Sequence, residues 1–482
     1  MEKIRARLNI GSKAEPVKLR KRKSQLYSVL GVSVFTVAFR LINCFLVQTS
    51  FVPDEYWQSL EVAHLMVFEY PSIYKILHFF TYDAVQLLVW LPRVVQALLA
   101  ALADIKLYCL IQSLEHSDVA KWTYLCQLSS WFTWYCCTRT LTNTMETTLT
   151  TLALYYYPLP GSKTHNSTKY LILVALAVIV RPTALIVWLP LLVYHFWQED
   201  NKLKLITHHC LPIGALTLGI STLIDCMFYG KWTLVQYNFL MFNVFHNVAE
   251  FYGSHPWHWY FTQGFVVVIG PHLPFFLYGC TLASKRYRII CLAHKEFRFI
   301  YPVLPFCMVF CGIALVNLRT WRRPAACALL VSNLVPALYT GLLHQRGTLD
   351  VMGHLQTLCD DSDPSTPPLP EVLFLMPCHS TPFYSHIHCP MKMRFLECPP
   401  DLTGDKSYVD EAERFFADPH HWLRTSFPYK SMLPTHLVFF DVLEKEISAF
   451  LDGSRFMRST EIFHTHVPEG RVGKSILVYQ RH

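Results

Sequence analysis

The chain has 482 residues, of which 52% are hydrophobic and only 16% are charged, and its mean hydropathy is +0.26. This composition excludes a string of soluble domains and predicts a polytopic membrane protein. Lys and Arg outnumber Asp and Glu by 42 to 34, but no folded nucleic-acid reader accompanies the excess. We therefore expect the basic residues to set membrane topology rather than to bind nucleic acid.

The first 24 residues form a basic arm that includes Lys13, Arg20 and Lys23. An apolar run follows from about Leu26, with Arg40 as its only charge, and its length is sufficient to cross the hydrocarbon core as a helix. The positive-inside tendency places the basic arm in the cytosol. The run begins late and no small-residue cleavage pattern follows it, so no cleavable signal peptide is expected.

Two adjacent carboxylates, Asp54 and Glu55, follow this first run in the sequence FVPDEYWQ. Pro53 ends the span, and Tyr56 and Trp57 suit the headgroup layer. The pair therefore lies at the far edge of the membrane, where acidic side chains are candidates for a reaction centre. A solvated acidic loop is the alternative interpretation.

Further apolar runs predict additional membrane helices. They lie at about 84–103, 122–137, 147–159, 170–197, 210–229, 265–283, 299–317 and 325–344. With the first run, they predict a multi-pass module over 25–344, in which about 48–83 forms a loop on the far side of the membrane.

The basic clusters at 285–288 and 319–323 both favour the cytosol, yet only the run at 299–317 separates them. A single crossing puts the two clusters on opposite sides. Ile289–Ala293 is too short to cross, since a helix rises about 1.5 Å per residue. The run at 299–317 could instead enter and leave the membrane on the same side, or one of the two basic clusters could lie in the lumen. We favour a third explanation, that the chain lacks a membrane helix which this architecture is expected to have.

Charged residues inside a membrane need a partner or a task. Arg139, Asn143 and Glu146 are spaced i, i+4, i+7, which predicts one shared polar helix face. That face either lines a substrate groove or joins two helices through hydrogen bonds. Arg181 precedes a proline inside a later run, so the helix is kinked or ended there, and Arg181 either reaches a buried anion or marks a span boundary.

A charged cluster precedes the run at 299–317. His294, Lys295 and Arg298 can hold a phosphate or pyrophosphate, with Glu296 orienting Arg298. The alternative is an interfacial cluster whose charges pair internally.

From 345 to 482 the apolar runs shorten, which predicts a water-soluble domain of mixed α and β structure. Candidate strands lie at 372–376, 435–440 and 475–480. Its cysteines are Cys359, Cys378, Cys389 and Cys398. In an oxidising lumen they predict at least one disulfide, with the pairing left open. A zinc site is the weaker alternative because the spacing fits no standard finger.

Several segments together resemble the dolichol-dependent mannosyltransferases of glycosyltransferase family 22. They are FVPDEYWQSLE at 51–61, WFTWYCCTRTLTNTME at 131–146, SHPWHWY at 254–260, HKEFRFIYPVLP at 294–305, HQRGTLD at 344–350 and MPCHSTPFYSHIHCP at 376–390. The resemblance extends from about residue 25 to the C-terminus.

The resemblance implies a GT-C type fold in the endoplasmic reticulum membrane, with 345–482 in the lumen. It implies transfer of mannose from dolichyl phosphate mannose, in α1,2 linkage, onto the second mannose of the glycan of the GPI-anchor precursor. The expected partners are thus a lipid-linked donor and a glycolipid acceptor. No metal or other cofactor is expected, since similar enzymes with a monophosphate leaving group need none.

The resemblance also implies roles for the residues singled out above. Asp54 is the expected base, because the family places an acid at this position of the first luminal loop. Glu55 is expected to orient the acceptor or to tune the pKa of Asp54. Arg298 is the first candidate for the leaving phosphate, with His294 and Lys295 beside it and Arg181 as a weaker candidate. The catalytic chemistry expected is general-base removal of the acceptor's hydroxyl proton.

The sequence departs from this family at two places. After Tyr70 relatives continue with a longer luminal segment, whereas this chain passes directly to Pro71. Relatives also carry a full apolar helix where only Ile289–Ala293 remains here. These departures make an inactive, shortened isoform one alternative. A dolichol-dependent α1,2-mannosyltransferase of the N-glycan precursor is another, since such enzymes share the donor and an acidic first loop. A transporter is a third class, but the paired repeats typical of transporters are not found.

Overall fold

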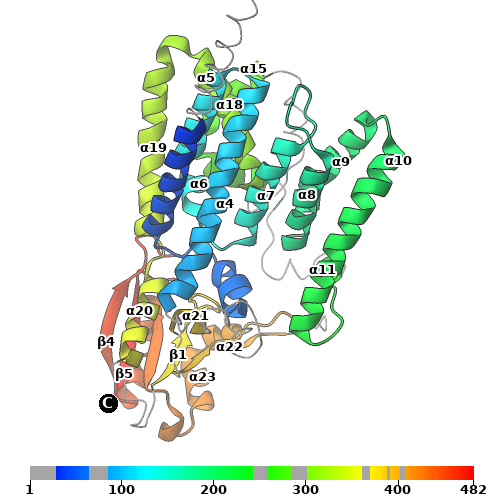
Figure 1. Cartoon of the computed structure of the whole chain (residues 1–482). Coiled ribbons are helices and arrows are strands. Elements are labelled where there is room, and N and C mark those ends of the chain that lie inside the picture. Colours follow the sequence, from blue (N-terminus) through cyan, green and yellow to red (C-terminus); the bar gives the residue numbers. More distant parts are fainter. Residues whose placement is uncertain are drawn as a thin grey trace, which may run out of the picture.

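The computed structural model describes residues 29–63, 85–242, 256, 258–283, 301–360, 370–387, 391–401 and 408–482. A helical bundle forms one part of the molecule, and an α/β unit packs against one end of it (Figure 1). The described residues of the bundle run up to Leu343, and the α/β unit contains the rest. The N-terminal arm, the cluster at 285–288, His294–Arg298 and Cys389 lie outside the described residues.

Within the described residues, five helical segments are long and apolar enough to cross a membrane. They are Val29–Leu46, Gln86–Leu114, Lys202–Tyr229, Thr262–Leu282 and Arg319–Cys359, and shorter apolar helices cover Ser167–Val180, Ala184–Gln198 and Tyr301–Asn317. The prediction of a polytopic helical membrane protein is confirmed.

The helices overlap the predicted runs, but the helix of the run at 84–103 extends to Leu114, and the runs at 122–137 and 265–283 are each divided between shorter helices. In chain order they are α4 (Val85–Leu114), α5 (Ser117–Ser129), α6 (Trp131–Cys136), α7 (Thr142–Tyr156), α8 (Ser167–Val180), α9 (Ala184–Gln198), α10 (Lys202–Lys204), η2 (Leu205–Cys210), α11 (Leu211–Tyr229), α12 (Val235–Leu240), η4 (Tyr260–Gly264), α14 (Phe265–Ile269), η5 (Gly270–His272), α15 (Leu273–Leu282), η7 (Tyr301–Val303), α18 (Leu304–Asn317), η8 (Arg319–Trp321) and α19 (Arg322–Leu342). The predicted break at Arg181 is confirmed, because Arg181 is extended between α8 and α9 and the following proline disfavours the helical conformation.

Two glycines let α18 pack closely against its neighbours. A Cβ atom on Gly312 of α18 would lie 2.7 Å from the backbone nitrogen of Thr123 in α5. A Cβ on Gly279 of α15 would lie 2.5 Å from the carbonyl carbon of Phe310 in α18. Small residues at helix contacts allow this approach, and close van der Waals packing is a main source of helix association in membranes.

A buried polar network joins the first helix to the next two. Arg40 donates to Asp104 of α4 at 2.7 Å, and both side chains are buried. Gln127 of α5 donates to the other carboxylate oxygen of Asp104 at 2.9 Å. The single charge of the first apolar run is therefore neutralised inside the bundle, as a membrane interior requires.

The α/β unit is built on a five-stranded mixed sheet with the order β2-β1-β3-β5-β4. The strands are β1 (Glu371–Leu375), β2 (Lys392–Phe395), β3 (His436–Phe440), β4 (Phe456–Phe463) and β5 (Ser475–Arg481). β1 pairs in parallel with β2 and β3, whereas β5 is antiparallel to β3 and β4. The three predicted strands are confirmed, and both strands that the sequence did not predict are edge strands.

Each face of this sheet packs into its own apolar core. Leu373, Leu437 and Leu477 face one core, which is covered by α22 (Glu411–Ala417), α23 (Pro419–Ser426) and α24 (Glu444–Gly453). Phe374 and Val438 face the other, with α20 (Gly347–Asp360) above them. The shorter elements of the unit are α21 (Tyr384–Ile387), η9 (Lys430–Met432) and η10 (Asp441–Leu443).

The α/β unit contains a disulfide between Cys378 and Cys398. Cys359 is also disulfide-bonded. The expectation of at least one disulfide is therefore confirmed. His379 lies beside the Cys378–Cys398 pair, but both sulfurs are bonded to each other, so the arrangement is a disulfide rather than the zinc site considered as an alternative.

The close contact of α18 with α5 predicts the effect of an added methyl group. Gly312→Ala is expected to lower the stability of the detergent-solubilised protein by about 1–3 kcal/mol, because the new Cβ meets the backbone of Thr123 as well as its short hydroxyl side chain. Thermal unfolding followed by size-exclusion chromatography measures the change. The matched control is Gly219→Ala in the membrane helix α11, where no atom lies within 4 Å of the new Cβ. Equal melting temperatures for the two variants would contradict the packing argument.

Candidate active site

The loop after the first helix is anchored to the end of α19. The backbone nitrogen of Gln48 donates to the carbonyl of Gly341 at 2.8 Å, and the Thr49 hydroxyl donates to the carbonyl of Thr340 at 2.5 Å. A turn follows at Pro53, whose carbonyl accepts from the backbone of Tyr56 and leads into the short helix η1 (Tyr56–Leu60). Asp54 and Glu55 therefore occupy a fixed turn, not a free solvated loop.

Glu55 is turned into the bundle and forms an ion pair with Arg139. The two side chains meet at 2.7 Å and are 2% and 0% exposed. Arg139 also donates to the carbonyls of Thr49 at 2.6 Å and Tyr135 at 2.8 Å, and lies over the Tyr135 ring. The pair joins the loop after the first helix to the turn that precedes α7.

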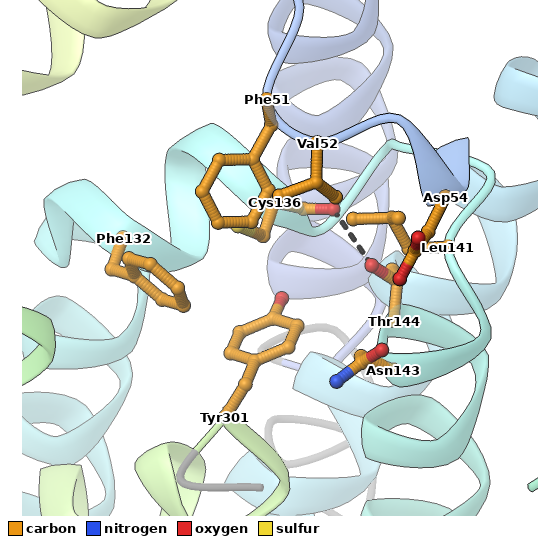
Figure 2. A pocket seen from close by; sticks show the side chains of 9 residues that line it. All are labelled: Phe51, Val52, Asp54, Phe132, Cys136, Leu141, Asn143, Thr144 and Tyr301. Atoms are coloured by element: carbon orange, nitrogen blue, oxygen red, sulfur yellow. Dashed lines mark hydrogen bonds between the residues drawn. The ribbon is translucent and has the colours of Figure 1, made fainter. Parts of the chain in front are cut away.

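Asp54 is directed the other way, into a cavity (Figure 2). The cavity encloses about 20 Å³, or about 370 Å³ when the open space at its mouth is included, and is lined by Phe51, Val52, Asp54, Phe132, Cys136, Leu141, Asn143, Thr144 and Tyr301. Figure 2 shows the carboxylate of Asp54 beside Thr144, with the Asn143 amide below Thr144 and the Tyr301 hydroxyl across the space from them. The lining is mainly apolar with a few polar groups, which is the usual character of a ligand site.

The prediction that Arg139, Asn143 and Glu146 share one helix face is wrong. Helix α7 begins only at Thr142, because Leu141 is extended at φ −95° and ψ 141°. Arg139 lies in the preceding turn, so the i, i+4, i+7 rule does not apply to it. The three side chains reach three places: Arg139 contacts Glu55, Asn143 lines the cavity and Glu146 contacts Arg181.

Arg181 and Glu146 form a second ion pair inside the bundle. They meet at 3.1 Å, with Glu146 1% and Arg181 15% exposed. This contact holds the extended residue between α8 and α9 against α7. Arg181, expected to contact the donor phosphate, and Glu146, expected to line a substrate groove, are therefore paired with each other.

The proposed phosphate cluster of His294, Lys295 and Arg298 lies outside the described residues. The described chain resumes at Tyr301, which lines the Asp54 cavity. The sequence predicts no role for Tyr301, although it lies in the motif HKEFRFIYPVLP, three residues after Arg298.

Trp57 was expected in the headgroup layer, but the structure places it elsewhere. Its indole nitrogen donates to the carbonyl of Thr381 at 2.9 Å in the α/β unit. Figure 1 shows this part of the chain between the lower end of α4 and the unit near α21. Trp57 therefore contacts protein rather than lipid headgroups.

The bundle with its acidic first loop and appended α/β unit is that of a GT-C membrane glycosyltransferase. The crystal structure of ArnT from Cupriavidus metallidurans bound to undecaprenyl phosphate shares the fold, with a TM-score of 0.55 and 10% identity over 94% of this chain and 98% of that one. A model of the Alg9-like mannosyltransferase family matches residues 32–73 and 70–388. The chain belongs to the Alg9-like mannosyltransferase family.

Relatives across animals are similar over almost their whole length. GPI alpha-1,2-mannosyltransferase 3 of Danio rerio is 61% identical over 100% of this chain and 98% of its own length. The protein of the same name from Homo sapiens is 57% identical over 96% and 92%, and GPI mannosyltransferase 3 of Drosophila melanogaster is 37% identical over 93% and 92%.

The comparisons also bear on the two missing segments. The Danio rerio alignment has 526 positions, more than the 482 residues of this chain, so that relative contains residues without a counterpart here. The family match is divided at residues 70–73, where the sequence predicts a shortened loop. The chain is therefore shorter than this relative, and the divided match agrees with the predicted shortening after Tyr70, whereas the missing helix at Ile289–Ala293 stays a prediction.

Removing the arginine of the buried Glu55–Arg139 pair is expected to cost much more stability than removing the arginine of an exposed ion pair. Arg139→Ala leaves the Glu55 carboxylate buried without its partner and is expected to destabilise the protein by about 3–5 kcal/mol. Arg471→Ala removes a similar contact to Glu413, at 2.9 Å, from an exposed pair and is expected to cost less than about 1 kcal/mol. Thermal unfolding of the purified protein compares the two.

A double variant separates the charge effect from general loss of packing. In Glu55→Leu/Arg139→Met both charges are replaced by apolar groups, so much of the stability lost in Arg139→Ala should return. Similar melting temperatures for Arg139→Ala and Arg471→Ala would contradict the assigned role of the pair.

Proposed function

We propose that this chain is a mannosyltransferase of the endoplasmic reticulum membrane that adds the third mannose, in α1,2 linkage, to the GPI-anchor precursor. The donor is dolichyl phosphate mannose. The observation that carries the proposal is the separation of the acidic pair, since Glu55 is neutralised by Arg139 while Asp54 lines a cavity. The names of the relatives, at 52% to 61% identity among vertebrates, support this acceptor and linkage.

Asp54 acts as the general base in this mechanism. Its carboxylate takes the proton of the acceptor hydroxyl as that oxygen forms a bond to C1 of the donor mannose, and dolichyl phosphate leaves from the opposite face with the bonding electrons. The stereochemistry at C1 is inverted. The cavity gives Asp54 an apolar surrounding, in which the carboxylate is less solvated and interacts more strongly with a bound hydroxyl.

The leaving phosphate needs positive charge beside it. Arg298 is the proposed first contact, with His294 and Lys295 next to it, because this motif runs directly into Tyr301 at the Asp54 cavity. Arg181 is a weaker candidate, since it is paired with Glu146. The reaction as proposed uses no metal, because one monophosphate can be stabilised by side-chain cations alone.

Glu55 has a different role in this proposal from the one expected of it. Its carboxylate is buried and paired with Arg139, so it does not face the Asp54 cavity. We assign it to holding the loop in which Asp54 lies. Asn143 lines the cavity and is the member of the predicted polar face that remains a candidate for substrate contact.

The membrane orientation is part of the proposal. The first helix and α19 both end at the Gln48–Gly341 contact, so their starting residues, Val29 and Arg322, lie at the opposite end of the bundle. Val29, which the basic arm precedes in the sequence, and the Arg319–Arg323 cluster thus lie at one end, which favours the cytosol for that end. Asp54 and the disulfide-bonded unit lie at the other end, and disulfides favour the lumen.

A rescue assay tests the activity and the base together. The chain is expected to restore surface GPI-anchored proteins, measured by flow cytometry, in cells that lack the third mannose. Asp54→Asn should lower transfer at least about 100-fold, because a positioned base contributes that much or more. Full activity of Asp54→Asn would refute its role as the base.

Two controls define the outcome of this assay. Asp118→Asn changes an exposed carboxylate at the start of α5 and should rescue fully. A version of the chain with both missing segments restored distinguishes an inactive shortened isoform from a wrong functional assignment. Rescue by the restored version alone would identify the inactive isoform, and failure of both would count against the proposed function.

The orientation is tested by N-glycosylation, which occurs only in the lumen. Tyr429 is 69% exposed in the α/β unit, and Tyr429→Asn creates the acceptor Asn-Lys-Ser. We expect this variant to gain one endoglycosidase-sensitive glycan. The natural sequence Asn166-Ser167-Thr168 is also a glycosylation acceptor and serves as the control, because α7 begins at the Asp54 cavity and carries the chain about 22 Å away from it before Asn166.

The natural chain should therefore remain unglycosylated at Asn166. A glycan on Asn166, or none on the Tyr429→Asn variant, would reverse the proposed orientation.

A further inference from the structure

The helix that follows Asp54 is attached to the α/β unit by the carboxylate of Glu61. One oxygen of Glu61 accepts from the backbone nitrogen of Phe383 at 2.7 Å and from the Ser385 hydroxyl at 2.5 Å. The other oxygen accepts from the Ser385 nitrogen at 3.2 Å. Burial raises the pKa of Glu61, and these donors oppose the shift. One side chain thus receives hydrogen bonds from residues more than 300 positions away along the chain.

Trp57, one helical turn before Glu61, makes the second attachment. Its indole nitrogen donates to the Thr381 carbonyl at 2.9 Å. Its ring packs against the rings of His379 at 4.5 Å and Phe395 at 4.8 Å between centroids. An aromatic box of this kind fixes both the depth and the rotation of an indole.

The partner of these residues is the segment Pro377–Ile387, called here the docking segment. The disulfide of Cys378 with Cys398 ties its start to the chain that follows β2. His379 has a φ of +62°, a left-handed conformation that side chains other than Gly adopt rarely. The fold holds this conformation in place, and the imidazole of His379 lies against Trp57.

The described residues that line the Asp54 cavity all come from the bundle and its first loop, and none comes from the α/β unit. The unit nevertheless contacts the two turns of helix directly after Asp54. An electrostatic contact is also present, since burial lowers the pKa of His379 and the Asp54 carboxylate opposes this shift. The unit can therefore act on Asp54 without touching the bound substrates.

We propose that the docking segment positions Asp54 for mannose transfer by holding the helix after it, with Glu61 and Trp57 as positioning residues. This inference rests on the proposed function of Asp54 as the base. Glu55 and Arg139 hold the turn from the bundle side, and Glu61 and Trp57 hold it from the side of the α/β unit. A displacement of about 1 Å at a reacting group can cost on the order of 100-fold in rate.

The test uses purified full-length protein with dolichyl phosphate mannose and a mannosylated GPI precursor as substrates. Glu61→Ala is expected to lower kcat about 10- to 100-fold with little change in either KM, because the substrate contacts remain. Ser385→Ala removes one of the hydrogen bonds and should lower kcat less. The double variant should equal Glu61→Ala, since both changes act on one contact.

Glu413→Gln is the matched control, a glutamate of the same unit in an exposed pair with Arg471, and it should leave kcat unchanged. Retention of the Cys378–Cys398 disulfide and of the elution volume shows that each variant is folded. If Glu61→Ala does not fold, Ser385→Ala decides alone, with a lowered kcat at constant KM supporting the inference and an unchanged kcat overturning it.

A second series separates the inference from the proposed function. In the Asp54→Asn background, residual transfer followed with radiolabelled donor should not fall further on Glu61→Ala, because Glu61 acts through Asp54. A further fall of 10-fold would show that Glu61 acts on the fold in general and would overturn the inference. If Asp54→Asn is inactive while Glu61→Ala keeps its kcat, the assignment of Asp54 as the base is supported and the positioning role of Glu61 is refuted. If Asp54→Asn is fully active, both fail.

Discussion

The structure around the site depends on the buried ion pair of Glu55 with Arg139. Removing two charges from water is costly, and the cost is offset here by a 2.7 Å contact and by further hydrogen bonds from Arg139 to the carbonyls of Thr49 and Tyr135. The pair joins residues 84 positions apart. Because Glu55 is committed to this contact, the adjacent Asp54 is left at the surface of the cavity, and two neighbouring acids acquire different chemistry.

The same principle organises the rest of the bundle. Arg40 is paired with Asp104, and Arg181 with Glu146, so these charges inside the described bundle are partnered across helices. Such pairs specify which helices meet, whereas apolar side chains in a lipid environment do so weakly. Close packing at Gly312 and Gly279 then sets how near the helices approach. Specific polar contacts and small residues together place the loop, the turn before α7 and Tyr301 around one space.

The chain is shorter than the relatives it matches, and the shortening leaves this arrangement in place. Asp54, its cavity and the Glu55–Arg139 pair all lie within the described residues. The family match is divided at residues 70–73, and the second predicted shortening precedes His294, so both positions lie outside the described part of the chain. The base side of the proposed reaction is therefore built by the residues that remain, and the shortening concerns the segments next to the acceptor loop and the proposed phosphate cluster.

The sequence alone determined the membrane-spanning runs, the break at Arg181, three of the strands and the position of Asp54 at the end of the first span. These features follow from hydropathy, length and proline chemistry, which act locally. Tertiary structure alone decided that Arg139 leaves the helix face of Asn143 and Glu146, that Glu55 is neutralised, and that Trp57 binds the α/β unit. The contacts of Arg139, Glu55 and Trp57 are made with partners 84 to 324 residues away, and no local periodicity encodes which distant group will meet a side chain in three dimensions.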